Sequence, residues 1–220
     1  MQVRIIEAYV GEYASGKSEI AINRALSLLG GELPVTLVDL DLVEPFYTLR
    51  PLKRELEGMG LAVITWDTKD VLGFGETGSL LMPQMRWALQ REGHVIFDVG
   101  YGVSGSRIFN LLEGIADSEL KIFAVLNASR PMTANLKDIV EYLQEFEQLD
   151  GLINNTHLGA ETELATIYHG VELCAAVAEV MGIPVIATAA DERFRAQLGA
   201  ADQRGNAILY LKRYMEKAFW

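Results

Sequence analysis

The residues of this chain that are best suited to chemistry are Gly11-Glu12-Tyr13-Ala14-Ser15-Gly16-Lys17-Ser18, which match the phosphate-loop pattern G-x-x-x-x-G-K-[ST]. Gly11 and Gly16 permit backbone angles that a side chain disfavours, so successive N–H groups can turn inward around a phosphate at a helix N-terminus. Lys17 is expected to reach the β- and γ-phosphates, and the Ser18 hydroxyl is expected to bind Mg²⁺. All eight residues are therefore candidate nucleotide contacts, and Lys17 is also a candidate catalytic residue.

The elements on either side of this motif are those that a phosphate loop requires. Residues 3–10 are apolar and rich in β-branched side chains, which predicts a strand, and residues 18–29 have the length and apolar content of a helix. A glycine-containing strand-to-helix turn could match the pattern by chance. The correct flanking elements make that the weaker interpretation.

Carboxylates end two further predicted strands. Residues 35–40 lead into Asp39-Leu40-Asp41, and residues 95–98 are an apolar run that ends in Asp98. Ligands of parallel sheets lie beyond the carboxyl ends of the strands, so these acids should lie beside the phosphates. We expect Asp98 to hold Mg²⁺ directly or through water, with Asp39 as a second acid of the metal site. Acids at strand ends also serve as helix caps or lie in solvated turns, which is the alternative for Asp39 and Asp41.

The rest of the chain repeats this strand-to-helix alternation. Further strands are predicted at 61–66, 120–126, 149–153 and 183–187, and further helices at 49–57, 82–91, 134–146, 162–181, 190–198 and 206–219. The alternation predicts one α/β domain over residues 1–220, with a three-layer, doubly wound, mostly parallel sheet. Residues 67–83 are either a binding loop or an ordinary solvent loop, and the glycine-rich residues 99–105 are placed to sense a γ-phosphate.

The composition excludes several classes of protein. The formal net charge of −11 opposes binding to nucleic acid or to acidic lipid. No apolar run approaches the length that spans a bilayer, and the N-terminus lacks the shape of a signal peptide, so we expect a cytosolic protein. The three histidines lack metal-ligand spacing. The single cysteine, Cys174, is expected to be a small core residue on an apolar helix face.

These motifs resemble the signal-recognition, MinD and BioD-like (SIMIBI) class of P-loop NTPases, and within it the CobQ/CobB/MinD/ParA nucleotide-binding domains. The resemblance extends over nearly the whole chain and rests on residues 11–18, 38–41, 97–100 and 151–155. It implies ATP or ADP with Mg²⁺ as ligands. It also implies that Asp41 orients the attacking water and that Asn155, rather than Asn154, hydrogen-bonds the adenine edge.

Two positions depart from that family. Its MinD and ParA members carry a lysine at the second loop position that reaches the nucleotide of a dimer partner, whereas this chain has Glu12. That cross-dimer mechanism therefore cannot be carried over, although we still expect a homodimer. In addition, Tyr101 stands where the γ-phosphate-sensing loop of the family often has a glycine.

The choice of base follows from the residues after the predicted asparagine. Guanine-specific relatives place an aspartate three residues beyond it, where the carboxylate accepts both guanine N–H groups. The corresponding residues here are His157, counted from Asn154, and Leu158, counted from Asn155. Neither is an acid, which favours ATP over GTP.

The sequence therefore predicts an Mg²⁺-dependent ATPase whose hydrolysis drives a conformational or assembly step for an unidentified client. One alternative is an ATP-dependent ligase or kinase resembling dethiobiotin synthetase. Another is a nucleotide-gated binding module with negligible turnover.

The predicted C-terminal helix at 206–219 has two interpretations. Apolar residues at helical spacing, with Lys212, Arg213 and Lys217 beside them, could form a membrane anchor like the one at the end of MinD. The favoured interpretation is a final helix packed against the sheet, because the chain is acidic and membrane binding is therefore unlikely.

Overall fold

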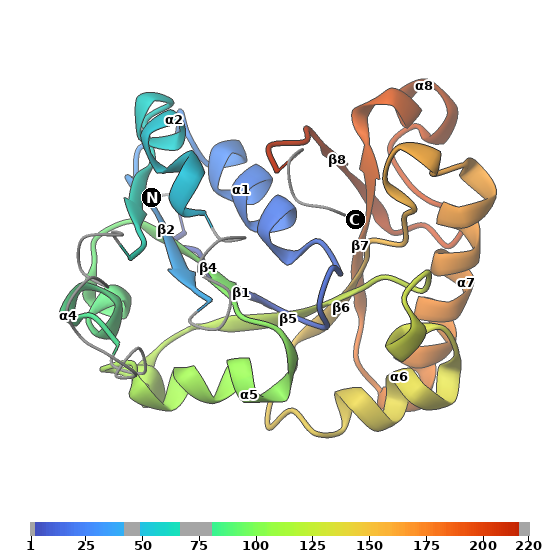
Figure 1. Ribbon diagram of the computed structural model, residues 1–220, viewed down its shortest axis with the longest axis horizontal. Coiled ribbons are helices and arrows are strands. Elements are labelled where there is room, and N and C mark those ends of the chain that lie inside the picture. The colour runs from blue at the N-terminus through green and yellow to red at the C-terminus, as the bar shows by residue number, and fades with distance from the viewer. Residues whose placement is uncertain (1–2, 42–48, 67–80, 216–220) are drawn as a thin grey trace.

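The computed structural model describes residues 3–41, 49–66 and 81–215, which contain one eight-stranded sheet (Figure 1). The order across the sheet is β3-β2-β4-β1-β5-β6-β7-β8, and all neighbouring strands are parallel. The strands are β1 (Ile6–Val10), β2 (Val35–Leu40), β3 (Ala62–Ile64), β4 (His94–Val99), β5 (Lys121–Leu126), β6 (Gly151–Asn154), β7 (Val185–Asp191) and β8 (Ala207–Leu211). The predicted α/β class and doubly wound sheet are confirmed.

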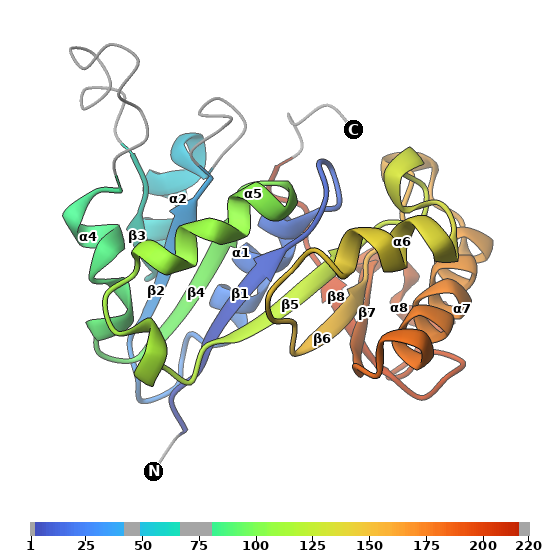
Figure 2. The same ribbon diagram turned by 90° about the horizontal axis from the view of Figure 1, so that it is seen from below.

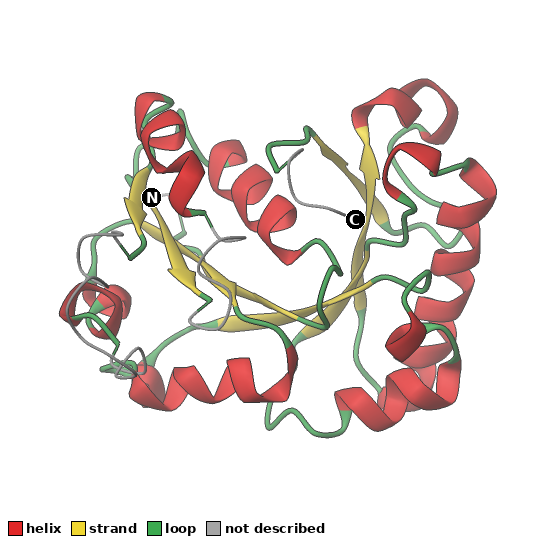
Figure 3. Ribbon diagram, in the orientation of Figure 1, coloured by secondary structure: helices red, strands yellow, loops and turns green. Residues whose placement is uncertain are grey.

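Helices cover both faces of the sheet, so the described chain has three layers (Figures 2 and 3). The helices α1 (Lys17–Ser27) and α2 (Lys53–Gly58) lie on one face. The opposite face carries α4 (Pro83–Arg86), α5 (Gly102–Ser106), α6 (Leu136–Leu143) and α7 (Leu164–Met181). The short helix α8 (Arg195–Leu198) lies at the β7–β8 edge.

The strand order places β1 near the middle of the sheet. The chain builds β2 and β3 on one side, returns to β4 beside β1, and then builds β5 to β8 on the other side. In such sheets the crevice at the carboxyl end of the central strand, where the winding reverses, is the usual ligand position. Residues 11–18 follow β1 and therefore lie at that crevice.

Several predicted helices are shorter than expected. The predicted helix 82–91 is interrupted, with α4 followed by a 3-10 turn at Ala88–Gln90. The predicted helix 190–198 begins late, because β7 continues to Asp191 and only Arg195–Leu198 is α-helical. The glycine-rich residues predicted as the loop 99–105 enter α5 at Gly102. Most of the predicted loop 67–83 lies outside the described residues.

The predicted C-terminal helix is wrong, because residues 207–211 form the edge strand β8. Leu209 and Leu211 pack with the α1-side core, whereas Ile208 and Tyr210 pack on the opposite face with α7 and α8. A strand that is apolar on both faces also contains apolar residues at helical spacing, so the pattern fits both a helix and a strand. Pairing with the open edge of β7 favours the strand. A helical membrane anchor over 206–219 is therefore excluded for residues 207–215, and residues after 215 lie outside the described chain.

The helix α7 differs from the expectation that no segment approaches the length and apolar character of a membrane span. It has 18 residues with a mean hydropathy of 1.3, which is long and apolar enough for a membrane span by length and composition alone. In the structure one of its faces packs against β6 and β7, and the buried residues there include Ile167, Val171 and Cys174. Burial raises the pKa of the Cys174 thiol to about 12, so the predicted core role of this cysteine is confirmed.

Gly170 lets α7 approach the end of β6. A Cβ atom at Gly170 would lie 2.2 Å from Thr156 Oγ1 and 2.4 Å from Asn154 Oδ1. Alanine normally stabilises a helix relative to glycine, but overpacking of this kind costs about 1–3 kcal/mol. We expect Gly170→Ala to lower the free energy of unfolding in urea titrations.

The matched control is Gly58→Ala. Gly58 is also helical, but a Cβ atom there would meet nothing within 4 Å, so this variant should be neutral or up to about 1 kcal/mol more stable. Equal effects of the two substitutions would show that the contact between α7 and β6 does not require a glycine.

Candidate functional site

The loop after β1 has the conformation that its glycines predict. The φ angles of Gly11 and Gly16 are 150° and 88°, and Ala14 also has a positive φ of 55°, which is uncommon for a residue with a side chain. A Cβ atom at Gly11 would lie 2.5 Å from the carbonyl oxygen of Val125 on β5, so only glycine fits there. Gly16 caps α1, which begins at Lys17.

The carbonyl groups of this loop are bonded to partners around it. The carbonyl of Gly11 accepts from Gly102 N (3.1 Å), and that of Glu12 accepts from Ser15 N (3.2 Å) and Lys17 Nζ (3.0 Å). The remaining acceptor contacts are Ala14 O with Arg130 Nε (3.3 Å), Ser15 O with Asn155 Nδ2 (2.7 Å) and Gly16 O with Ile20 N (3.1 Å). The carbonyls of Gly11, Ala14 and Ser15 accept from residues outside the loop, whereas Glu12 O accepts from the loop's own Ser15 N and Lys17 Nζ. A trans peptide points its C=O and N–H in opposite directions, so a peptide whose carbonyl is bonded outside the loop can turn its N–H group toward the loop interior.

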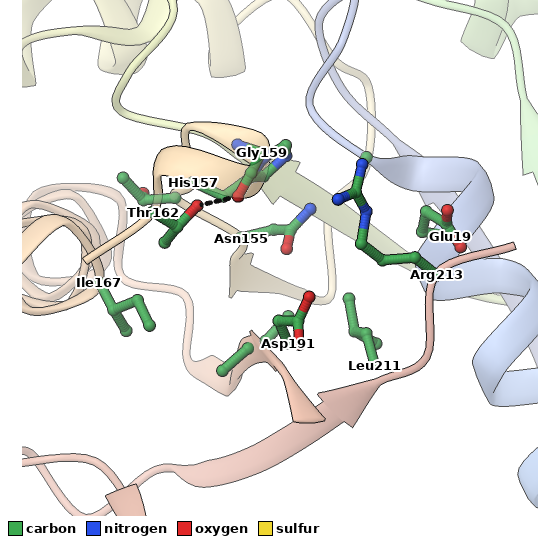
Figure 4. Close-up of a pocket in the computed structure, with 13 residues that line it drawn as sticks. Glu19, Asn155, His157, Gly159, Thr162, Ile167, Asp191, Leu211 and Arg213 are labelled. Atoms are coloured by element: carbon green, nitrogen blue, oxygen red, sulfur yellow. Dashed lines mark hydrogen bonds between the residues drawn. The ribbon is translucent and has the colours of Figure 1, made fainter. Parts of the chain in front are cut away.

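Asn155 donates a hydrogen bond to the loop and also lines a neighbouring pocket. Its side chain is 5% exposed, and its Nδ2 atom would lie only 2.1 Å from a Cβ atom at Gly16. The side-chain oxygen is turned toward Asp191 in the neighbouring pocket (Figure 4). The amide is therefore placed both to support the loop and to accept a hydrogen bond from a ligand. Asn154 is fully buried, and its Oδ1 accepts from Thr156 N and Oγ1.

The two predicted metal-site acids lie side by side. Asp39 and Asp98 are register partners on β2 and β4, and both are buried. Burial raises the pKa of Asp39 to about 6. Hydrogen bonds from Thr65 Oγ1 (2.7 Å) and Asp41 N (3.0 Å) act in the opposite direction. Burial, followed by the charge of Asp39, raises the pKa of Asp98 to about 8, although a hydrogen bond from Ser18 and the charge of Lys17 act in the opposite direction.

These surroundings fit a cation beside Asp98. Both oxygens of Asp39 accept hydrogen bonds, whereas Asp98 Oδ1 is buried with no hydrogen-bond partner among the described residues. A divalent cation would satisfy that oxygen and favour the ionised carboxylate. In the described ranges no group of three or more His, Cys, Asp or Glu side chains could hold a metal ion by itself. A metal here would therefore need further oxygen ligands, which the Ser18 hydroxyl and a phosphate can supply.

Asp41 lies at the carboxyl end of β2, half-buried beside the strand β4. A Cβ atom at Gly100 would lie 3.1 Å from Asp41 Oδ1, so Gly100 leaves room for this carboxylate. The structure thus brings Asp41, Asp98 and the loop to the same edge of the sheet. The residues that follow, 42–48, lie outside the described chain.

A pocket opens beside the loop, on the side of β6 and β7 (Figure 4). Its walls come from the start of α1, the ends of β6, β7 and β8, and the turns that follow these strands. The lining residues are Gly16, Glu19, Asn155, Thr156, His157, Gly159, Thr162, Ile167, Ala189, Ala190, Asp191, Leu211 and Arg213. Because Gly16 belongs to both the loop and the pocket, one ligand can occupy the two together.

His157 is neutral in this pocket. Its burial and the charges of Arg130 and Arg213 lower its pKa to about 4. Its Nδ1 atom accepts from Gly159 N at 3.2 Å, which leaves the proton on Nε2. The histidine therefore presents a hydrogen-bond donor and no charge.

Comparisons with known proteins agree with this architecture. No protein-family model matches the chain, and no curated protein sequence matches it. Among solved structures, the signal recognition particle receptor FtsY from Elizabethkingia anophelis superposes with a TM-score of 0.57 at 16% identity, over 86% of this chain and 59% of that one. The cell division protein FtsY from Thermotoga maritima gives 0.57 at 16% identity, over 86% and 62%. FlhF complexed with GTP and Mg²⁺ gives 0.52 at 16% identity, over 84% and 64%.

The fold is the α/β fold of P-loop NTPases. The chain spans about three fifths of the length of these structures, so the likeness concerns their shared nucleotide-binding fold. The sequence analysis singled out residues 11–18, the acids and Asn155, which the structure brings to one edge of the sheet. It missed Arg130, Asp191 and Arg213, because no motif marks them and each reaches the site from a separate strand end.

The raised pKa of Asp98 leads to a stability prediction for the metal-free protein. Between about pH 4 and 8 the folded state keeps a proton on Asp98 that the unfolded chain has released, so stability falls as pH rises through this range. Asp98→Asn removes this effect. Both proteins are measured in EDTA. We expect the Tm of the variant minus the Tm of the parent to be several degrees larger at pH 8.5 than at pH 5.

The comparison requires scanning calorimetry of both proteins at the two pH values. Addition of Mg²⁺ and nucleotide should stabilise the parent more than the variant, because only the aspartate can ionise beside a cation. A Tm difference that is independent of pH would contradict the raised pKa.

Proposed function

We propose that this chain is an Mg²⁺-dependent, ATP-binding P-loop NTPase of the CobQ/CobB/MinD/ParA type, whose nucleotide state controls an unidentified partner. The observation that carries the proposal is the P-loop itself, whose Ala14 and Ser15 carbonyls are bonded to residues outside the loop, while the Asp98 carboxylate lies beside Lys17 and Ser18. The arrangement suits an anion of high charge with an associated cation. FlhF, which has the same fold, is complexed with GTP and Mg²⁺.

The P-loop residues have distinct roles in this proposal. The inward N–H groups would hold the phosphates, and Lys17 Nζ, now 3.0 Å from Glu12 O, would add its charge to the β- and γ-phosphates. Ser18 and Asp98 would hold Mg²⁺, which neutralises phosphate charge when bound. Asp39 lies beside Asp98 and would influence whether Asp98 is ionised, because its charge raises the pKa of Asp98. Asp41 would orient the attacking water.

We propose adenine as the base, and the pocket offers acceptors for its amino group. Asp191 Oδ1 accepts from Arg193 N at 2.9 Å, and the other oxygen of this carboxylate can accept from the adenine amino group. The oxygen of Asn155 is a second such acceptor on the same side (Figure 4).

Glu12 shapes the loop of its own subunit. Its Oε1 accepts from Tyr13 N at 2.9 Å, and Tyr13 packs edge-on against Tyr101 with ring centroids 6.0 Å apart. Tyr101 directly precedes α5, so these aromatic rings connect the P-loop to the segment after Asp98. We include a cytosolic homodimer in the proposal, with the dimer contact made by residues other than Glu12.

The first functional prediction concerns Lys17. Lys17→Ala should reduce Mg²⁺-dependent phosphate release from ATP on the order of 100-fold or more, because it removes the cation placed on the transferring phosphoryl group. Steady-state phosphate release without added substrate measures this, and Arg54→Ala, at an exposed position of α2, controls for loss of a positive charge. Turnover within a few-fold of the parent would refute the proposal, and nucleotide binding without turnover would favour the binding-module alternative.

The second functional prediction concerns the base. ATP should bind more tightly than GTP in calorimetric titrations, and Asn155→Ala should lower the preference by about 2- to 10-fold through loss of a hydrogen bond. The variant also loses the contact with Ser15 O, so tripolyphosphate affinity is measured beside it to separate loop damage from base recognition. Equal affinities of the parent for ATP and GTP would refute the adenine assignment.

A further inference from the structure

The segment after β8 is attached to α1 by side chains of that helix. We call residues 212–215 the C-terminal strap. Asn23 Nδ2 donates to Lys212 O and Asn23 Oδ1 accepts from Lys212 N, each at 2.9 Å. The Glu19 carboxylate accepts from Tyr214 N at 3.0 Å and from Met215 N at 2.7 Å. Met215 is buried in the core on the α1 side, so the strap is anchored at both ends.

Arg213 lies between these attachment points and faces the pocket beside the P-loop. Figure 4 shows its side chain leaving the strap and extending past the start of α1, with its guanidinium near Asn155. The residue is half-buried. His157 lines the same pocket, and the charge of Arg213 contributes to lowering the pKa of this histidine.

The guanidinium of Arg213 forms no hydrogen bond or ion pair with another residue of the described chain, although two acids line the same pocket. The Glu19 carboxylate is occupied by the strap N–H groups, and Asp191 Oδ1 accepts from Arg193 N. In a chain with a net charge of −11, a half-buried arginine held away from both carboxylates is unusual.

We propose that Arg213 contacts the nucleoside of a bound nucleotide, and that Asn23 and Glu19 are positioning residues that hold the strap for it. This inference rests on the proposed function. Gly16 lines both the P-loop and the pocket, so a nucleotide with its phosphates on the loop places its nucleoside between Arg213 and the residues after β6. A guanidinium is planar and weakly hydrated, which suits it to stack on a purine ring. The C-terminal strap thereby becomes one wall of the nucleotide site.

The test compares a nucleotide with its phosphates alone. Arg213→Ala should weaken binding of Mg²⁺-ATP, or of Mg²⁺-GTP if the parent prefers it, by about 3- to 30-fold in calorimetric titrations. Binding of tripolyphosphate should remain within twofold of the parent. Asn23→Ala should give a smaller loss of the same kind, since it frees the strap without removing Arg213, and Arg213→Lys should restore only part of the affinity.

Arg54→Ala is the matched control. It removes an exposed arginine from α2, which contributes no residue to the pocket or the strap. Equal nucleotide affinities of Arg213→Ala and Arg54→Ala would overturn the inference and leave the proposed function intact. A parallel loss of tripolyphosphate binding in Arg213→Ala would overturn the nucleoside contact as well. Failure of the parent to bind either nucleotide would instead overturn the proposed function.

Discussion

The hydrogen bond from Asn155 Nδ2 to the carbonyl oxygen of Ser15 is the contact on which the site depends. It spans 2.7 Å between residues that are 140 positions apart, and both residues are buried. A P-loop can present N–H groups to an anion only when its carbonyls are accepted elsewhere, because unpaired buried carbonyls are costly. Asn155, Arg130 and Gly102 supply those donors from three different strand ends. The sheet therefore determines the loop conformation as much as the glycines do.

The acids behind the loop show how function can oppose stability. Burial raises the pKa of both Asp39 and Asp98, which occupy adjacent strand positions, and the charge of Asp39 raises the pKa of Asp98 further. Asp39 is compensated by Thr65 and by the Asp41 backbone, whereas Asp98 keeps an oxygen without a partner among the described residues. A core selected for stability alone would place apolar side chains there. This unpartnered oxygen of Asp98 is understandable if a cation occupies the neighbouring space during function.

The candidate site is assembled from both ends of the chain. The loop after β1 and the helix α1 come from the first 27 residues, and the strap that faces them begins at residue 212. The strap is held by the Asn23 and Glu19 side chains and by burial of Met215 in the α1-side core. The same helix therefore begins at the loop and holds the strap.

The sequence by itself determined the phosphate motif, the acids at the strand ends and the alternation of strands and helices. These features are local, since spacing, β-branched runs and glycine positions record them directly. It also identified Asn155, although only through a resemblance, and the sequence contained no sign that this side chain would support the P-loop. The order of the eight strands followed no local pattern.

The tertiary structure alone decided the C-terminal region and the walls of the pocket. Residues 207–211 have apolar side chains on both faces, and helical spacing fits them until the open edge of β7 is known. Arg130, Asp191 and Arg213 carry no motif, and they meet the P-loop because parallel strands bring their carboxyl ends to one edge. Their roles depend on contacts between residues far apart in the chain, and periodicity contains no information about such contacts.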